Sequence, residues 1–228
     1  ENDKKLAPDD VIVMMPDIDT YAPVIEAVFL AGPREQRIPF SIADRGIATQ
    51  SPLVAGFFEL LALPDNRFDA NSVMGILDVA AVQRRLELQE NDVELIHTYV
   101  RNTGIRWGLD GDAKKALGLP NTKEHTWRFG LDRLLLGYAL PAENRAAFAG
   151  VVPYDEIEAS QAVVVGRLNS FINDLAVFAE DLNKDMTADK WTSLLINAIE
   201  ERFFTLNDED LTEIAPLRAA INSLRERL

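Results

Sequence analysis

Two clusters of aromatic and basic residues lie near the middle of the chain, at residues 104–110 and 125–131. Each cluster places a tryptophan directly beside an arginine, Trp107 beside Arg106 and Trp127 beside Arg128. Indoles can stack on the bases of single-stranded nucleic acid, where each stacked base contributes about 1 to 3 kcal/mol, and guanidinium groups can pair with phosphates. The same residues can also pack inside a protein, because arginine often covers an indole. Base stacking, contact with another subunit and internal packing are therefore three interpretations of these clusters.

The segment that contains both clusters is positively charged within an acidic protein. Residues 101–145 carry eight basic and five acidic side chains, a balance of +3, so the rest of the chain must carry −17 to reach the net charge of −14. Such a net charge opposes extended contact with a phosphate backbone, so any contact with DNA should be local. The candidate residues for contact with DNA or another subunit are Arg106, Trp107, His125, Trp127, Arg128 and Arg133.

Carboxylates at two places have a spacing that could suit a metal ion. Asp17 and Asp19 follow a strand-like run, where carboxylates can hold Mg²⁺ beside a phosphate. The alternative is that they form a turn or cap the next helix by accepting hydrogen bonds from free amides. Asp110 and Asp112 resemble the start of a calcium loop, but its twelfth position is Asn121 rather than a bidentate glutamate. We therefore expect a polar turn there.

Other catalytic or metal-binding patterns are missing from the sequence. His97 lies on an apolar helical stripe, which favours a hydrogen-bonded core or boundary residue, and His125 lies at a predicted helix start. The chain has no cysteine, so thiolate ligands, thiol nucleophiles and disulfides are excluded. It has no Gly-x-x-x-x-Gly-Lys-Ser/Thr loop, no Gly-x-Gly-x-x-Gly and no Gly-x-Ser-x-Gly elbow. We predict no catalytic residue, no metal site and no bound cofactor.

Length and composition indicate a globular protein. The 228 residues are 47% hydrophobic, which suits one domain or two small ones with a substantial core. No apolar run approaches the roughly 20 residues that span a bilayer, so we expect a cytoplasmic protein without membrane contact. The sequence starts without methionine and soon enters a strand-like run, so we also expect it to be part of a longer polypeptide.

The predicted elements change in character near residue 48. Residues 10–16 and 37–43 are predicted strands, with a helix over residues 21–31 between them. Such a strand-helix-strand unit implies parallel pairing, as at one edge of a nucleotide-binding α/β domain. After residue 48 the hydrophobic period becomes about 3.6, which predicts helices in the rest of the chain.

The first predicted helices lead up to the two clusters. We expect one helix from Ser51 to Leu63, one capped by Asn71, and one capped by Asn91 that stops at a left-handed Gly104.

A helix over residues 126–138 should then carry the second cluster. Its predicted apolar face comprises Trp127, Leu131, Leu134, Leu135 and Tyr138. Gly130 and Gly137 fall beside this face, and each glycine costs about 1 kcal/mol relative to alanine in a helix interior. The pair therefore predicts that another backbone approaches the helix closely.

The last third of the chain has a strong helical pattern. One long helix should bury a stripe formed by Val164, Leu168, Phe171, Leu175, Phe178 and Leu182. Thr187 should precede a second helix, with Trp191, Leu194, Leu195, Ala198 and Ile199 on its packing face. A final helix starts at residues 207–210, of which the last three are acidic, and ends with Arg225 and Arg227, as the helix dipole prefers, with Pro216 expected to kink or divide it.

Seven runs of residues carry a family resemblance: residues 10–14, 16–21, 27–29, 38–45, 104–108, 125–131 and 135–138. They resemble the middle of RecC, the gamma subunit of exodeoxyribonuclease V. The resemblance spans roughly residues 8–155, while the C-terminal helices match mainly by pattern. The family's chain is several times longer than this one.

This resemblance implies a non-catalytic subunit of the RecBCD helicase-nuclease, an ATP-dependent exodeoxyribonuclease of DNA double-strand break repair and recombination. RecB-like and RecD-like partners would complete a heterotrimer, supply the motors and the nuclease, and bind ATP and Mg²⁺. The gamma subunit would help to split the duplex, guide single strands and recognise the Chi sequence. No residue known to read Chi or to catalyse in the family maps onto this chain, so no such role is transferred.

The expected fold is mostly α with a small N-terminal β-α-β element. By analogy, residues 1–48 would be a strand-helix-strand piece of an inactive RecA-like motor domain, the start of the second motor-like domain of a superfamily 1 helicase. Residues 49–228 would form an all-helical, 2B-like insertion domain. The expected role is architectural, and contact with DNA is expected only through the full complex. The alternatives are a free-standing helical interaction module without a DNA role and a metal enzyme that uses Asp17 and Asp19.

Overall fold

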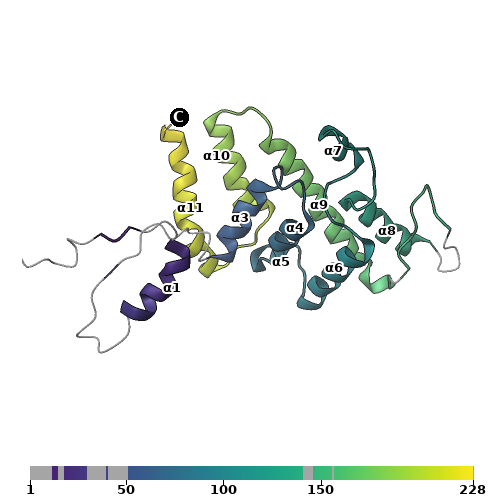
Figure 1. Cartoon of the computed structure of the whole chain (residues 1–228), viewed down its shortest axis with the longest axis horizontal. Coiled ribbons are helices and arrows are strands. Elements are labelled where there is room, and N and C mark those ends of the chain that lie inside the picture. Colours follow the sequence, from purple (N-terminus) through teal and green to yellow (C-terminus); the bar gives the residue numbers. More distant parts are fainter. Residues whose placement is uncertain are drawn as a thin grey trace, which may run out of the picture. The chain divides into compact units, whose positions relative to one another are not determined.

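The structure is a computed structural model that describes residues 12–14, 18–29, 40, 51–140, 146–155 and 157–227. The chain divides into two compact units, residues 1–51 and residues 52–228. Helices dominate the described residues, which contain no β-strand (Figure 1).

The first unit contains one described helix, α1 (Ile18–Phe29). The predicted helix over residues 21–31 is therefore present and starts three residues earlier, while residues 30 and 31 lie outside the described part. Of the two predicted strands, residues 12–14 and Phe40 belong to no strand, and the other residues of both lie outside the described part. The rings of Phe29 and Phe40 meet edge to face with centroids 5.3 Å apart. The β-α-β element is thus not confirmed.

The second unit begins with α3 (Pro52–Ala62), α4 (Ala70–Leu77), α5 (Ala80–Arg85) and α6 (Glu90–Thr103). Helix α3 agrees with the predicted helix within one residue at its C-terminal end. The predicted caps of α4 and α6 are wrong by two residues.

These two caps show how acidic side chains set the helix starts. The side chain of Asp69, not Asn71, accepts hydrogen bonds from the first turn of α4. Helix α6 starts from a capping box in which Gln89 and Asp92 bond each other's backbone N–H groups. Several polar residues near each start could cap it, so the sequence alone does not choose among them.

Helices α7 (Gly111–Ala116) and α8 (Trp127–Ala139) follow, and a short 3-10 turn, η3 (Ala159–Gln161), leads into the long α9 (Ala162–Leu182). Thr126 caps α8 by accepting a hydrogen bond from the N–H of Phe129 at 3.3 Å, so the helix predicted over residues 126–138 is present and lies one residue later. The predicted face of α8 is only partly correct. Its first half is buried, whereas Leu135 and Tyr138 are 39% and 53% exposed.

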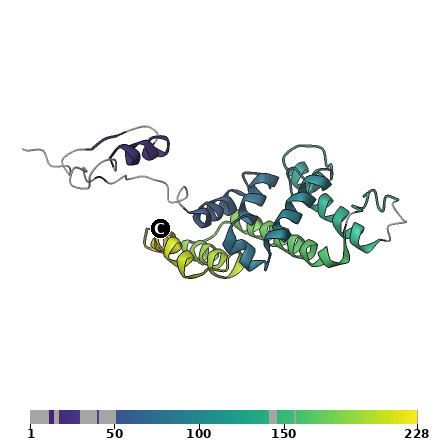
Figure 2. The same ribbon diagram turned by 90° about the horizontal axis from the view of Figure 1, so that it is seen from below.

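Helix α9 forms the centre of the second unit, and α3, α6 and α8 pack against it (Figure 2). The predicted stripe from Val164 to Phe178 is buried, while Leu182 at its end is half-buried. Residues 159–182 have the length and mean hydropathy, 1.3, of a membrane span, and 50% of that window is buried within the protein. A core helix passes the same test, so the finding is weak as an indication of a membrane span.

The C-terminal helices are α10 (Ala188–Asn197), a π-helical turn η4 (Ala198–Arg202) and α11 (Asp208–Arg227). Helix α11 packs against α10 and α3. Thr187 directly precedes α10, as predicted, and is its N-cap residue. Helix α11 runs through Pro216 without interruption, so the proline does not divide it.

Candidate functional site

The first tryptophan cluster starts where α6 ends. Gly104 has φ of +78°, in the left-handed region that favours glycine. The N–H of Ile105 donates to the carbonyl oxygen of Val100 at 3.2 Å, and the Ile105 side chain is buried. The predicted glycine stop is confirmed. It turns the chain sharply and positions Arg106 and Trp107 directly after the turn.

The two tryptophan clusters are bonded to each other through their main chains. Four hydrogen bonds join them. The N–H groups of Arg106 and Trp107 both donate to the carbonyl oxygen of His125, at 2.9 and 3.2 Å. In the other direction, the N–H of Trp127 donates to the carbonyl oxygen of Gly108 at 3.0 Å, and the N–H of Arg128 donates to the carbonyl oxygen of Leu109 at 2.9 Å. The first N–H groups of a helix have no acceptor within it. The first cluster supplies acceptors for two of these groups in α8.

A third segment, residues 67–70, completes the arrangement. The N–H of Gly108 donates to the carbonyl oxygen of Arg67 at 2.9 Å, and the N–H of Ala70 donates to that of Arg106 at 2.8 Å. The indole N–H of Trp127 donates to the carbonyl oxygen of Phe68 at 2.9 Å. We define the tryptophan junction as residues 67–70, 104–110 and 125–131.

Three non-glycine residues of the tryptophan junction have left-handed backbone angles. Arg67 and Phe68 both have φ of +54°, and His125 has φ of +65°. Such angles cost about 1 to 2 kcal/mol per residue. The hydrogen bonds of the junction offset this cost, including one from the His125 side chain. Its Nδ1 lies 2.8 Å from the carbonyl oxygen of Gly104 and must donate, because a carbonyl only accepts.

The two indoles lie in different environments. Trp127 is fully buried, which confirms its packing interpretation. Trp107 is half-buried, and the ammonium of Lys114 lies 5.1 Å from the centre of its ring. Lys114 is itself only 6% exposed, and its Nζ donates to the carbonyl oxygen of Glu124 at 2.7 Å. A lysine buried in this way holds α7 against the junction.

The arginines of the candidate set differ in what they contact. The guanidinium of Arg128 donates to the side chain of Asn173 on α9. That of Arg133 donates to the carbonyl oxygens of Val152 and Thr103, at 3.0 and 2.9 Å. Arg106 is exposed and donates to its neighbour Ile105 at 3.0 Å. Arg128 and Arg133 therefore join α8 to its surroundings, whereas Arg106 faces solvent.

The two glycines of α8 allow close packing, as predicted. A Cβ at Gly137 would collide with the carbonyl oxygen of Tyr154, a backbone group. A Cβ at Gly130 would collide with the side chain of Ile105. The close backbone approach is confirmed at Gly137, while a side chain fills the equivalent space at Gly130.

The described residues contain no group of three or more side chains arranged to bind a metal ion. His97 pairs with Asp78, with Nε2 2.8 Å from Oδ1. Asp110 caps α7 by accepting a hydrogen bond from the N–H of Ala113 at 2.8 Å, and Asp112 lies within that helix, so a helix start is found where a polar turn was predicted. Asp19 lies in α1, and Asp17 lies outside the described residues. The chemistry visible at the tryptophan junction is hydrogen bonding and packing.

The third segment of the junction and Lys114 were not predicted from the sequence. Nothing in the run from Arg67 to Ala70 indicates that its carbonyl oxygens accept bonds from residues some 40 to 60 positions later. The only local signal is Asp69, a residue type that is common at helix starts.

The fold and the junction define the class of protein: an all-helical domain whose distinctive aromatic motifs hold its own helices together. The sequence profile described as RecBCD enzyme subunit RecC fourth domain matches residues 50–228. The chain belongs to the RecC family.

Three relatives named RecBCD enzyme subunit RecC illustrate this membership. The protein of Escherichia coli K12 is 39% identical over 191 residues, which cover 84% of this chain and 17% of the relative. That of Mycobacterium tuberculosis H37Rv is 32% identical over 206 residues, covering 88% and 19%. That of Haemophilus influenzae Rd is 31% identical over 229 residues, covering 99% and 20%. The chain thus spans about a fifth of the length of these relatives.

Proposed function

We propose that this chain is an architectural part of a RecC subunit that works within a RecBCD enzyme in DNA double-strand break repair and recombination. The observation that supports this role is the tryptophan junction. Its main chain and side chains bond α8 to the end of α6 and to the turn before α4. Residues that resemble the family most specifically are therefore used to fix the positions of helices. A domain whose helices are held in fixed positions can serve as a rigid structural part of a larger assembly.

In the proposed assembly, RecB-like and RecD-like subunits complete a heterotrimer in the cytoplasm. They supply the motors and the nuclease and bind ATP and Mg²⁺. Residues 1–48 would be the strand-helix-strand piece of an inactive, RecA-like motor domain of helicase type, and residues 49–228 its 2B-like helical insertion. The full complex meets DNA, splits the duplex, guides the single strands and recognises Chi. The sequence supports a non-catalytic role because it has no phosphate-binding loop.

The first test measures catalysis and assembly. The purified chain should show no ATP turnover and no exonuclease activity above buffer, with and without DNA. A full-length RecC relative that carries the equivalent of Trp127→Ala should assemble less well with its partner subunits than one that carries Tyr138→Ala on the exposed face of α8. ATP turnover by the pure chain, or equal assembly of the two variants, would contradict the proposal.

A second test addresses direct contact with DNA. Arg106 is the best probe, because Arg128 and Arg133 also hold the fold together. Binding of a fluorescent single-stranded oligonucleotide is measured at several salt concentrations for wild type, Arg106→Ala and the control Lys190→Ala, an exposed lysine outside the positive segment. Local contact predicts weaker binding and a smaller salt slope for Arg106→Ala only. Equal behaviour of both variants would remove Arg106 from the contact surface.

A further inference from the structure

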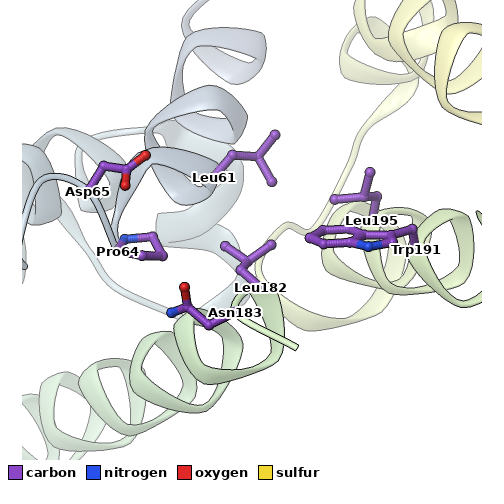
Figure 3. Close-up of a pocket in the computed structure, with 7 residues that line it drawn as sticks. All are labelled: Leu61, Pro64, Asp65, Leu182, Asn183, Trp191 and Leu195. Carbon is purple, nitrogen blue, oxygen red and sulfur yellow. The ribbon is translucent and has the colours of Figure 1, made fainter. Parts of the chain in front are cut away.

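A pocket of about 300 Å³ opens where the ends of α3 and α9 meet the start of α10 (Figure 3). Its apolar walls are Leu61, Pro64, Leu182 and Leu195. This volume is at the lower end of the range of small-ligand pockets, about 300 to 1,000 Å³, so it suits one long side chain better than a cofactor. The pocket shares no residue with the tryptophan junction.

The polar groups of the pocket lie on different sides of it. Figure 3 shows Asp65 on the α3 side and Trp191 on the α10 side, with Leu182 between them. The Asp65 side chain is exposed and forms no ion pair within the described residues. The nearby Lys184 is already paired with Asp181 at 2.7 Å. The carboxylate of Asp65 is therefore available to a cation from outside.

Two further side chains that line the pocket each have a polar atom that is free to form a hydrogen bond. Trp191 is half-buried, and its indole N–H donates to none of the described residues. The Nδ2 of Asn183 donates to the carbonyl oxygen of Ala179 at 3.0 Å, which leaves its side-chain oxygen as an acceptor. Apolar walls, an indole and unpaired acceptors together match a ligand with an apolar stem and a polar, positively charged end.

We propose that this pocket accepts an arginine side chain presented by a partner polypeptide. The stem would lie along Leu182 and Trp191, and the guanidinium would pair with Asp65. Arginine fits better than lysine because its planar guanidinium can form two parallel hydrogen bonds to a carboxylate, while its stem packs against apolar side chains. The net charge of −14 favours a basic partner segment and disfavours nucleic acid, since a phosphate would face Asp65. This inference goes beyond the proposed function and does not depend on it.

The binding test uses nuclear magnetic resonance of the ¹⁵N-labelled chain. Its three tryptophans give three indole N–H signals, and Trp191→Phe identifies the signal of Trp191. The probe is N-acetyl-arginine methylamide, and the matched probe is its citrulline equivalent, which has nearly the same shape without the charge. We expect the Trp191 signal to shift saturably, with roughly fivefold tighter binding of the arginine probe, as for an exposed ion pair.

Variants separate the charge from the shape of the pocket. Asp65→Asn should reduce the preference for arginine over citrulline to about twofold or less. The control Glu94→Gln, which removes an exposed carboxylate from α6, should leave the preference unchanged.

Three results would overturn the inference: an unmoved Trp191 signal, equal binding of the two probes by wild type, or an unchanged preference in Asp65→Asn. Displacement of the arginine probe by a short single-stranded oligonucleotide would also overturn it, because the pocket would then bind nucleic acid. Failure of RecBCD assembly or of DNA binding would leave these outcomes unaffected, so the two proposals are tested separately.

Discussion

The indole N–H of Trp127 donates a hydrogen bond of 2.9 Å to the carbonyl oxygen of Phe68, which lies 59 residues earlier in the chain. Trp127 is fully buried and Phe68 is 8% exposed. A buried carbonyl that loses its donor costs about 1 to 3 kcal/mol. This bond therefore holds α8 to the turn before α4, and it explains why the tryptophan is part of the core.

Removing the donor while keeping an aromatic ring tests this bond. Trp127→Phe should lower the free energy of unfolding by at least about 1 to 3 kcal/mol, because the Phe68 carbonyl stays buried without a partner. Urea denaturation followed by circular dichroism measures the change. The control Tyr138→Phe removes an exposed hydroxyl from the same helix and should change the stability by less than about 0.5 kcal/mol. A similar loss in both variants would contradict the prediction.

Two glycines in long helices should respond to alanine in opposite directions. Gly137→Ala places a methyl group against the Tyr154 carbonyl oxygen and should destabilise the protein by about 1 to 3 kcal/mol. Gly166→Ala in α9 meets no atom within 4 Å and should stabilise it by about 0.5 to 1 kcal/mol. Thermal unfolding of both variants measures the difference. A stabilising Gly137→Ala would show that the loop at Tyr154 moves away freely.

The start of α4 allows the two candidate caps to be compared directly. The Oδ1 of Asp69 accepts bonds from the N–H groups of Asn71 and Ser72, at 2.9 and 3.4 Å. Asp69→Ala should cost about 0.5 to 2 kcal/mol, whereas Asn71→Ala should be nearly neutral or slightly stabilising. Chemical denaturation measures both. A larger loss for Asn71→Ala would favour the cap that the sequence indicated.

Tyr99 predicts an alkaline loss of stability. Burial, with smaller contributions from Tyr154 and Glu158, raises the pKa of Tyr99 from 10.0 to about 12. The unfolded state therefore releases this proton first as the pH rises. The stabilising contribution is complete below pH 10 and is lost between pH 10 and about pH 12. Tyr99→Phe should flatten this part of the stability profile, measured by urea denaturation from pH 9 upward. Parallel profiles for wild type and Tyr99→Phe would contradict the prediction.

The helices were largely predictable, because their signals lie within a few residues of one another. The predicted apolar stripe of α9, the glycine stop of α6 and the position of α8 agree with the structure. The caps of α4 and α6 were placed wrongly, since several neighbouring side chains can each bond the first turn. Leu135 and Tyr138 were expected in the core and are exposed. Periodicity gives the width of an apolar face but not how much of it a neighbour covers.

The sequence by itself determined the helical class of residues after 48, the main helix ends and the family resemblance. These depend on local spacing and on residue identity. Only the tertiary structure decided that the two tryptophan clusters bond to each other and to residues 67–70, and that Asp65 and Trp191 border one pocket. Contacts between residues distant in sequence follow from how the helices pack. Main-chain hydrogen bonds cannot be predicted from the pattern of side chains, because every residue except proline carries the same main-chain donor and acceptor. The clusters that suggested chemistry in the sequence form a packing junction in the fold.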